Sequence, residues 1–327
     1  MQRRPSRFAS GSPSRLPARS IAPRRAVGSG GDRRSFRPAH RAAFTLIELL
    51  VVIAVIVLVV SLLLVAIAAA RSAASRAGDV STLRQLAAAH AAYANDHTQR
   101  LLPGYVNADL QASLPIKTDL ADGTVVAPAA AATYVWRLAP YVDRNWQTFH
   151  RNADPGTRAR LDAQYAAGDL TEIALQPSYA LNSIFIGGDS DHGGGDATAR
   201  SPWNTQGNPT IAATRVTDLR NPTQLVLFAP VTLAGNGGNG TNASNTAWHE
   251  LRAPYLKVQQ WSFGAGGTVT AAAAAATPEG IPSVGKGAAI LPVAFCDGSA
   301  TGVRLEELAE DMRRWAPFAD GPKWRVP

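Results

Sequence analysis

The main feature of the hydropathy pattern is one long apolar stretch near the start of the chain. Residues 49–70 read LLVVIAVIVLVVSLLLVAIAAA, in which Ser61 is the only polar side chain. As a helix this stretch would be ~33 Å long, which matches the hydrocarbon thickness of a bilayer. Backbone polar groups in lipid must be satisfied within the segment, so its many β-branched residues do not favour a strand. The pattern therefore predicts a membrane-spanning helix.

After the apolar stretch, the pattern becomes that of an amphipathic helix. Apolar and aromatic residues recur at spacings of three and four, which places them on one helical face. Proline is absent between Phe44 and Arg100, and Pro103-Gly104 provides a stop. We expect one helix with two parts, residues 44–70 in the membrane and residues 71–100 as the amphipathic spine of the domain that follows. The predicted buried face contains Leu83, Leu86, His90, Tyr93 and His97.

The rest of the chain, residues 101–327, alternates short apolar runs with turn-forming residues, which is typical of an antiparallel sheet. Asp297-Gly298 separates two runs and indicates a hairpin, because glycine accepts the positive φ that the turn needs. With the long helix, these runs predict an α+β head in which the helix packs on the sheet. The predicted strands are residues 178–186, 224–228, 255–263, 289–295 and 302–305.

Shorter helices and loop insertions complete the expected head. One helix is expected at residues 133–151, interrupted at Pro140, and another at residues 305–315. The polar, glycine-rich residues 234–247 cannot bury enough apolar area to fold and are expected to form a solvated loop. The alanine run at residues 271–276 is compatible with either a short helix or a linker.

The positive charge of the chain is concentrated at its N-terminus. The whole chain has a formal net charge of +8, but residues 1–43 contain eleven arginines and one acid and carry +10. Residues 44–327 therefore carry −2, which argues against a head that binds nucleic acid. Residues 1–43 are rich in Arg, Ser, Pro and Gly, which predicts a disordered leader. Because the arginine-rich side of a span stays in the cytoplasm, we expect the head on the other side.

Two features of the apolar stretch leave alternatives open. A secretory signal peptide would be cleaved after Ala66-Ile67-Ala68 or Ala68-Ala69-Ala70 and would release a soluble protein. The stretch is longer than the apolar region of a signal peptide, which favours a retained helix. Glu48 lies at the edge of this helix, where a carboxylate is costly, so it either has a charged partner or is hydrated at the membrane interface.

Residues 44–54, FTLIELLVVIA, resemble the N-terminal cleavage and methylation segment of type IV prepilins and of type II secretion pseudopilins. The resemblance implies that a prepilin peptidase cleaves between Ala43 and Phe44 and methylates the new amine of Phe44. It also implies that Glu48 is the assembly carboxylate, which faces the N-terminal amine of a neighbouring subunit. The family prefers glycine before the scissile bond, and Ala43 is a small residue there. An ammonium and a carboxylate in contact would offset each other's desolvation cost.

Four further short motifs resemble those of planctomycete and verrucomicrobial pseudopilin-like proteins of type II secretion. The C-terminal motif of that family is a histidine, nine residues and Asp-Gly; here Asp297-Gly298 is present and Gly287 stands at the histidine position. The resemblance implies a pilin-like fold and a structural subunit of a type II secretion pseudopilus or type IV pilus-like filament. The four motifs are LRQL at 83–86, YAND at 93–96, SYALN at 178–182 and FCDG at 295–298, the last followed by an acidic helix and Trp315.

The same resemblance implies a location and a set of partners. The chain would cross the inner (cytoplasmic) membrane once, with a cytoplasmic N-terminus and a periplasmic head. Its partners would be the prepilin peptidase, other pilin or pseudopilin subunits and the inner-membrane secretion platform.

One acidic loop is a candidate metal site. Asp189, Asp191 and Asp196 lie among glycines, and carboxylates in a flexible loop suit an oxygen-liganded ion such as calcium. The loop lacks the bidentate glutamate of a defined calcium loop, so a plain solvated loop is the alternative. His90 and His97 lie two helical turns apart, too far to share one ion without a bend.

The sequence contains no catalytic motif, and we expect no enzyme activity. The histidines of the head are scattered without ligand spacing (His150, His192 and His249), and Cys296 lies in an apolar run where a thiol is inert. The alternative to a filament subunit is a membrane-anchored extracytoplasmic protein that binds a ligand such as a polysaccharide and does not polymerise. Its binding residues would be exposed tryptophans, for which the candidates are Trp203, Trp248 and Trp261.

Overall fold

The computed structural model describes the long helix and most of the head. The described residues are 45–107, 111, 120, 123, 125–151, 153, 155–189, 211–231, 248–256, 258–263, 269–272, 280–282 and 290–326. The chain divides into two compact units, Met1–Val60 and Ser61–Pro327, and the head belongs to the second. Several predictions fall outside the described residues, namely those on Ala43, Phe44, Asp191, Asp196, His192, Trp203 and residues 234–247.

Helix α1, Leu46–Asp96, is continuous and confirms the predicted long helix. It ends before the predicted boundary at residue 100. Thr98 and Gln99 adopt positive φ angles of 54° and 63°, which a right-handed helix cannot contain. The local backbone, and not the proline further along, therefore ends the helix.

The second half of α1 buries one stripe of side chains in the head. The stripe begins at Asp79 and continues at spacings of three and four, which confirms most of the predicted face. His97 was predicted on this face but is exposed, because it follows the end of the helix. Its ring stacks on Tyr93, with the ring centroids 3.9 Å apart. The buried residues of α1 are Asp79, Thr82, Leu83, Leu86, Ala87, Ala89, His90 and Ala94.

The head contains the predicted antiparallel sheet, with four strands in the order β1-β2-β5-β6. The predicted hairpin joins β5 and β6, and Gly298 in its turn has a φ of 89°. Strand β1 is shorter than predicted, because the Ser183 amide bonds back to the Leu181 carbonyl at 2.7 Å and turns the chain. The strands are β1 Tyr179–Leu181, β2 Val226–Pro230, β5 Ile290–Phe295 and β6 Ala300–Arg304.

A separate two-stranded sheet pairs β3, Trp261–Phe263, with β4, Val269–Ala271. The predicted strand at residues 255–263 is thus reduced to β3. Its first residues form a tight turn instead, in which the Leu256 amide donates to the Val258 carbonyl at 3.0 Å. The first residue of the alanine run, Ala271, is the last residue of β4, a strand that the sequence pattern does not predict.

Short helices make up the rest of the head. The predicted helix at residues 133–151 is broken into α4, η1 and η2, because Asp143 and Arg144 adopt positive φ angles of 54° and 55°. The predicted helix at residues 305–315 divides into α7 and the 3₁₀ turn η4. The pattern does not predict α5 or α6. The helices are α3 Pro128–Ala131, α4 Tyr134–Leu138, η1 Ala139–Val142, η2 Trp146–His150, α5 Pro155–Ala166, α6 Leu170–Leu175, η3 Val216–Asp218, α7 Leu305–Glu310 and η4 Met312–Arg314.

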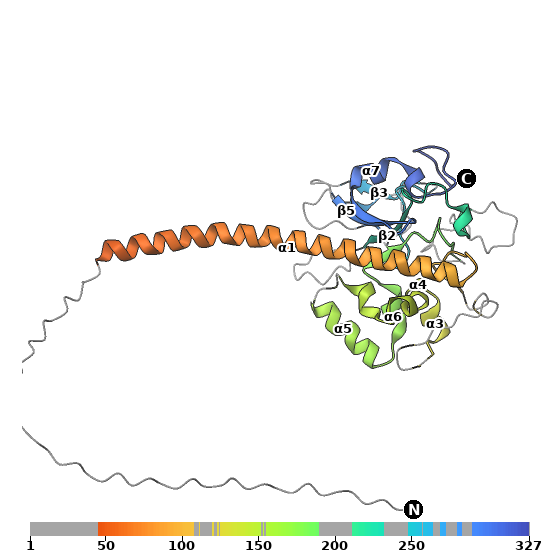
Figure 1. Ribbon diagram of the computed structural model, residues 1–327, viewed down its shortest axis with the longest axis horizontal. Coiled ribbons are helices and arrows are strands. Elements are labelled where there is room, and N and C mark those ends of the chain that lie inside the picture. Colours follow the sequence, from red (N-terminus) through yellow and green to blue (C-terminus); the bar gives the residue numbers. More distant parts are fainter. Residues whose placement is uncertain are drawn as a thin grey trace, which may run out of the picture. The chain divides into compact units, whose positions relative to one another are not determined.

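The head half of α1 lies between the sheet and the helices α3 to α6 (Figure 1). On the sheet side, the His90 ring lies edge-on to Phe228 of β2, with centroids 6.3 Å apart. On the helix side, the Tyr141 hydroxyl of η1 donates to Asp96 Oδ2 at 3.0 Å. The core of the head therefore forms on both sides of this one helix.

Asn182, which belongs to the SYALN motif, connects three segments of the core. Its side chain is fully buried, and Nδ2 donates to the carbonyls of Val226 at 2.8 Å and Trp315 at 2.9 Å. Trp315 Nε1 in turn donates to the Leu308 carbonyl of α7 at 2.7 Å. The C-terminal segment is thus fastened to the sheet by hydrogen bonds that would be costly to leave unpaired.

Two buried histidines make the stability of the head sensitive to acid. Burial lowers the pKa of His90 and of His150 from 6.5 to about 4. Both rings therefore stay neutral in the folded head, whereas the unfolded chain protonates them below its ordinary pKa. The stability that they contribute is complete above pH 6.5 and is lost as the pH falls toward 4.

We predict that the free energy of unfolding of the full chain in detergent decreases from about pH 7 to about pH 4.5. His90→Leu should weaken this pH dependence, because it removes one group that gains a proton on unfolding. His97→Leu, at an exposed position just beyond the same helix, is the control. Urea unfolding followed by tryptophan fluorescence measures both variants, and an unchanged pH dependence in His90→Leu would contradict the prediction.

Candidate functional site

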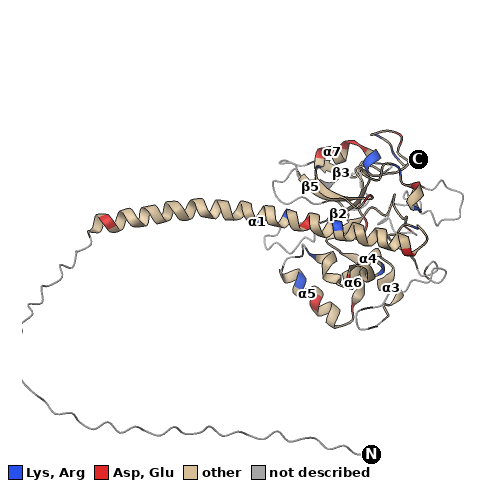
Figure 2. Ribbon diagram, in the orientation of Figure 1, with Lys and Arg blue, Asp and Glu red and all other residues tan. Residues whose placement is uncertain are grey.

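The first half of α1 is an uncovered apolar surface. Large hydrophobic side chains from Leu46 to Ile67 are exposed, with 87% of Leu46 and 38% of Ile67 accessible. By length and composition, α1 is long and apolar enough to cross a membrane, and no described residue buries its apolar window. Figure 2 shows the uncharged stretch between one acidic residue at the start of α1 and the charged residues of its head half. So large an apolar surface marks a site of contact with lipid or with other protein.

At the start of α1, Thr45 and Glu48 form a capping box. The Glu48 carboxylate accepts hydrogen bonds from the Thr45 amide at 2.9 Å and from the Thr45 hydroxyl at 2.7 Å. The Glu48 amide donates to the Thr45 hydroxyl oxygen at 3.3 Å. These reciprocal bonds satisfy donors that a helix otherwise leaves unpaired at its N-terminus. Glu48 is therefore exposed and bound to its own chain, with room for a further partner.

Where α1 enters the head, Asp79 holds a buried hydrogen-bond network. Its Oδ1 accepts from the Tyr179 hydroxyl of β1 at 2.9 Å and from Arg151 Nη1 at 3.1 Å. Arg151 reaches this point because Gly78 has no side chain, since a Cβ there would lie 1.8 Å from Arg151 Nη2. The network joins the helix to both layers of the head. It also offsets part of the cost of burying the carboxylate.

A polar groove of about 390 Å³ lies beside this network, between α1 and the η2–α5 region. Its floor is one face of α1, and its wall carries amide, hydroxyl and guanidinium groups. Arg158 Nη2 donates to the Arg151 carbonyl at 3.0 Å and to the His150 carbonyl at 3.5 Å. Such a lining can bind carboxylates or other polar groups. The groove is lined by Gly78, Ser81, Thr82, Gln85, Asn145, Gln147, Thr148, Arg151 and Arg158.

Of the three aspartates in the acidic loop, only Asp189 lies in the described part of the chain. It is buried, with 5% of its surface exposed, beside Gly104 and within electrostatic reach of Arg137. Arg137 is itself buried and donates to the Gly104 carbonyl at 2.8 Å, and burial lowers its pKa to about 10. Asp189 thus belongs to the head interior and not to a solvated loop. Within the described residues, no group of three acidic, histidine or cysteine side chains is placed to hold a metal ion.

Three other residues that the sequence analysis considers as site candidates are packed within the head. Trp261, a candidate for an exposed binding residue, is 1% exposed, so that expectation is wrong. Its indole donates to the Arg252 carbonyl at 2.9 Å, and its ring packs edge-on against Trp315. His249 is fully buried. Burial also raises the pKa of the Cys296 thiol, which keeps it protonated at neutral pH, as predicted.

Comparison of the chain with protein-family models, with curated proteins and with solved structures found no match. The candidate site therefore rests on geometry alone: an uncovered apolar half-helix with a capped carboxylate at its start, and a polar groove where the same helix enters the head.

We predict that Asp79→Ala lowers the free energy of unfolding of the full chain by about 1–3 kcal/mol, because it leaves the Tyr179 hydroxyl and Arg151 without their acceptor. Glu172→Ala is the matched control, since Glu172 also faces an arginine, Arg160, at 3.8 Å but is half exposed. It should cost less than about 0.5 kcal/mol. Equal losses in the two variants, measured by urea unfolding in detergent, would show that the Asp79 network has no special weight.

Proposed function

We propose that this chain is a structural subunit of a type II secretion pseudopilus or type IV pilus-like filament, with a pilin-like fold. The observation that carries the proposal is the division of α1. One half is packed inside an α+β head, and the other half is bare and apolar from Leu46 to Ile67. Such a helix can lie in lipid before assembly and against the helices of other copies afterwards, because both environments are apolar.

The N-terminal segment supports processing of the kind that prepilins undergo. Residues 1–43 carry the arginines that would hold the leader in the cytoplasm, and Ala43 and Phe44 are the proposed cleavage pair. The Thr45–Glu48 capping box lies wholly after this cleavage point and so would be kept in the mature chain. The proposed mature protein is a single-pass protein of the inner membrane with its head in the periplasm. The prepilin peptidase and the inner-membrane secretion platform would be its partners.

Glu48 is the proposed assembly residue. Among the described residues of a single chain, its carboxylate binds the amide and hydroxyl of Thr45, which are uncharged donors. The methylated amine of Phe44 on a neighbouring copy would add the positive charge that a carboxylate in lipid requires. A copy in the wrong register would leave both charges unpaired, so this contact would select one register.

A second candidate function is a membrane-anchored protein that binds a ligand and does not polymerise. The polar groove between α1 and the η2–α5 region favours it, because hydroxyl and amide groups line about 390 Å³ of open space. The burial of Trp261 removes one of the aromatic residues that a polysaccharide site would use.

A calcium ion bound through Asp189, Asp191 and Asp196 remains a separate proposal for the head.

The first test concerns processing. We predict that the intact mass of the protein from cell membranes corresponds to residues 44–327 with one added methyl group on Phe44. Ala43→Gly should be processed at least as completely, because glycine is also small. A mass that matches residues 1–327, or a start after Ala68 or Ala70, would contradict the prepilin proposal and favour an unprocessed anchor or a released protein.

The second test concerns Glu48. We use Cys296→Ala as the background and Val55→Cys as a reporter, so that a bis-maleimide reagent links neighbouring α1 helices in membranes. Glu48→Ala and Glu48→Gln should both insert in the membrane but lose the crosslinked dimer, which is the largest product that one cysteine per chain can give. Glutamine keeps the acceptor for the Thr45 cap and removes only the charge. A crosslinked dimer that Glu48→Gln retains and Glu48→Ala loses would assign Glu48 to capping alone.

A further inference from the structure

The filament proposal calls for contacts between heads, and among the described residues that line the groove beside α1, Arg158 is a cationic group available for such a contact. Arg151 is already paired with Asp79 at 3.1 Å. Arg158 bonds only to backbone carbonyls, and among the described residues no carboxylate lies within ion-pair distance of it. Its side chain is half-buried at the groove, where the amide of Asn145 adds a further donor, whereas the amide of Gln147 already donates to Asp162 Oδ1 at 3.2 Å. Among the described residues, the groove therefore offers a carboxylate the charge of Arg158 and a neighbouring amide donor.

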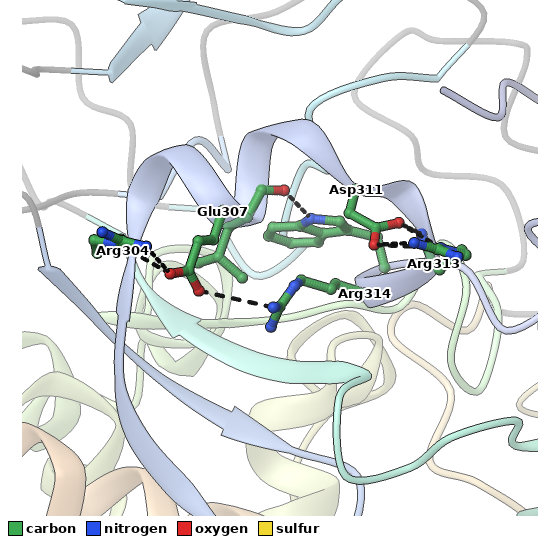
Figure 3. Close-up of polar contacts among 7 residues, drawn as sticks. Arg304, Glu307, Asp311, Arg313 and Arg314 are labelled. Atoms are coloured by element: carbon green, nitrogen blue, oxygen red, sulfur yellow. Dashed lines mark hydrogen bonds and ion pairs between the residues drawn. The ribbon is translucent and has the colours of Figure 1, made fainter. Parts of the chain in front are cut away.

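Acidic side chains of matching kind lie on α7. Figure 3 shows that Glu307 is held by Arg304 and Arg314, and that Asp311 is held by Arg313. Glu306 and Glu310 are exposed one helical turn apart, and neither makes an ion pair or hydrogen bond within the described part of the chain; Glu306 lies within electrostatic reach of Arg304. These two residues, here called the acidic ridge, are the carboxylates of α7 that remain open to a partner.

Helix α5, which carries Arg158, and helix α7, which carries the acidic ridge, lie on opposite sides of α1 (Figure 1). When two complementary surfaces lie on opposite sides of one molecule, a two-fold symmetric dimer cannot bring both pairs of surfaces into contact at once. They pair head to tail, and a head-to-tail contact repeats into a helical filament when the rotation does not close. The placement of the two charged surfaces is therefore that of a filament subunit.

We propose that the acidic ridge of one copy, Glu306 and Glu310 of α7, binds the groove at Arg158 on the next copy. The inference rests on the proposed filament function and names the contact between its heads. The partner is a second copy of this chain, because the charge that the groove lacks is present on the opposite side of the same head. Electrostatic complementarity of this kind fixes the partner and the register more than it adds affinity.

The first test crosslinks the two surfaces through cysteines, one of which replaces Glu306, and keeps the charged pair Arg158 and Glu310 in place. In the full chain with Cys296→Ala, Ser81→Cys marks the groove and Glu306→Cys marks the ridge, and a short bis-maleimide is applied to membranes. We expect dimers and longer ladders made only of this protein, as judged by mass spectrometry. Asn95→Cys with Glu306→Cys is the control, since Asn95 is exposed on the same helix outside the groove.

Charge reversal then tests the pair itself. Arg158→Glu and Glu310→Arg should each reduce the ladder about fivefold, the ratio for a contact worth about 1 kcal/mol. The two changes together should restore roughly half of it or more, because opposite charges again meet. Arg160→Glu, two residues along α5 and facing Glu172, should have little effect.

The Val55→Cys reporter separates this inference from the proposal on which it rests. If Val55→Cys gives a crosslinked dimer but the groove and ridge cysteines give no linked copies, the head contact is wrong and the filament proposal stands. If neither pair of reporters gives linked copies, both are wrong. Equal effects of Arg158→Glu and Arg160→Glu, no recovery in the double reversal, or linkage to an unrelated protein would also overturn the head contact.

Discussion

The head depends on burying one stripe of helix α1, which begins at Asp79 and continues to Ala94. The Asp79 carboxylate binds Tyr179 of β1 and Arg151 after η2, so one residue fastens both layers of the head to the same helix. Upstream of that point the side chains of α1 are exposed, and from Leu46 to Ile67 nearly all of them are apolar. The two halves of this continuous helix thus have different surroundings. One half packs in the core of its own head, and the other half needs an apolar environment that the described residues do not provide.

The elements with strong local signals were predictable from the sequence, and those set by distant contacts were not. The apolar stretch, the β5–β6 hairpin at Asp297-Gly298 and the antiparallel sheet follow from periodicity and turn chemistry. Helix α5 was missed because Leu161 is its one buried residue, so it carries almost no apolar period. The break after η1 was missed because positive φ at Asp143 and Arg144 has no marker as clear as glycine.

The candidate site shows the same division. The Thr45–Glu48 spacing is the local signature of a capping box, so the intrachain partner of Glu48 is predictable from the sequence. Asp79 was missed because its partners are 72 and 100 residues away in the chain. Extension of the periodic face back from Leu83 by four residues would have placed Asp79 on the buried side. The burial of Trp261 was not predictable for a similar reason, since its hydrogen bond to Arg252 and its packing on Trp315 form only in the folded head.

In the proposed filament, the two halves of α1 would carry different tasks. Packing of the apolar halves would supply attraction between copies, but it would fix their register only weakly, because the side chains from Leu46 to Ile67 are nearly all apolar. Charged groups do not tolerate sliding, since a displaced carboxylate or guanidinium loses its partner and remains partly desolvated. A single carboxylate at Glu48 would fix the register at one end of the subunit only. A second charged contact on the head, far from the first, would fix the rotation of each copy about its own helix, which one point of attachment leaves free. The charged pair at Arg158 and Glu310 would therefore matter less for the strength of assembly than for its geometry.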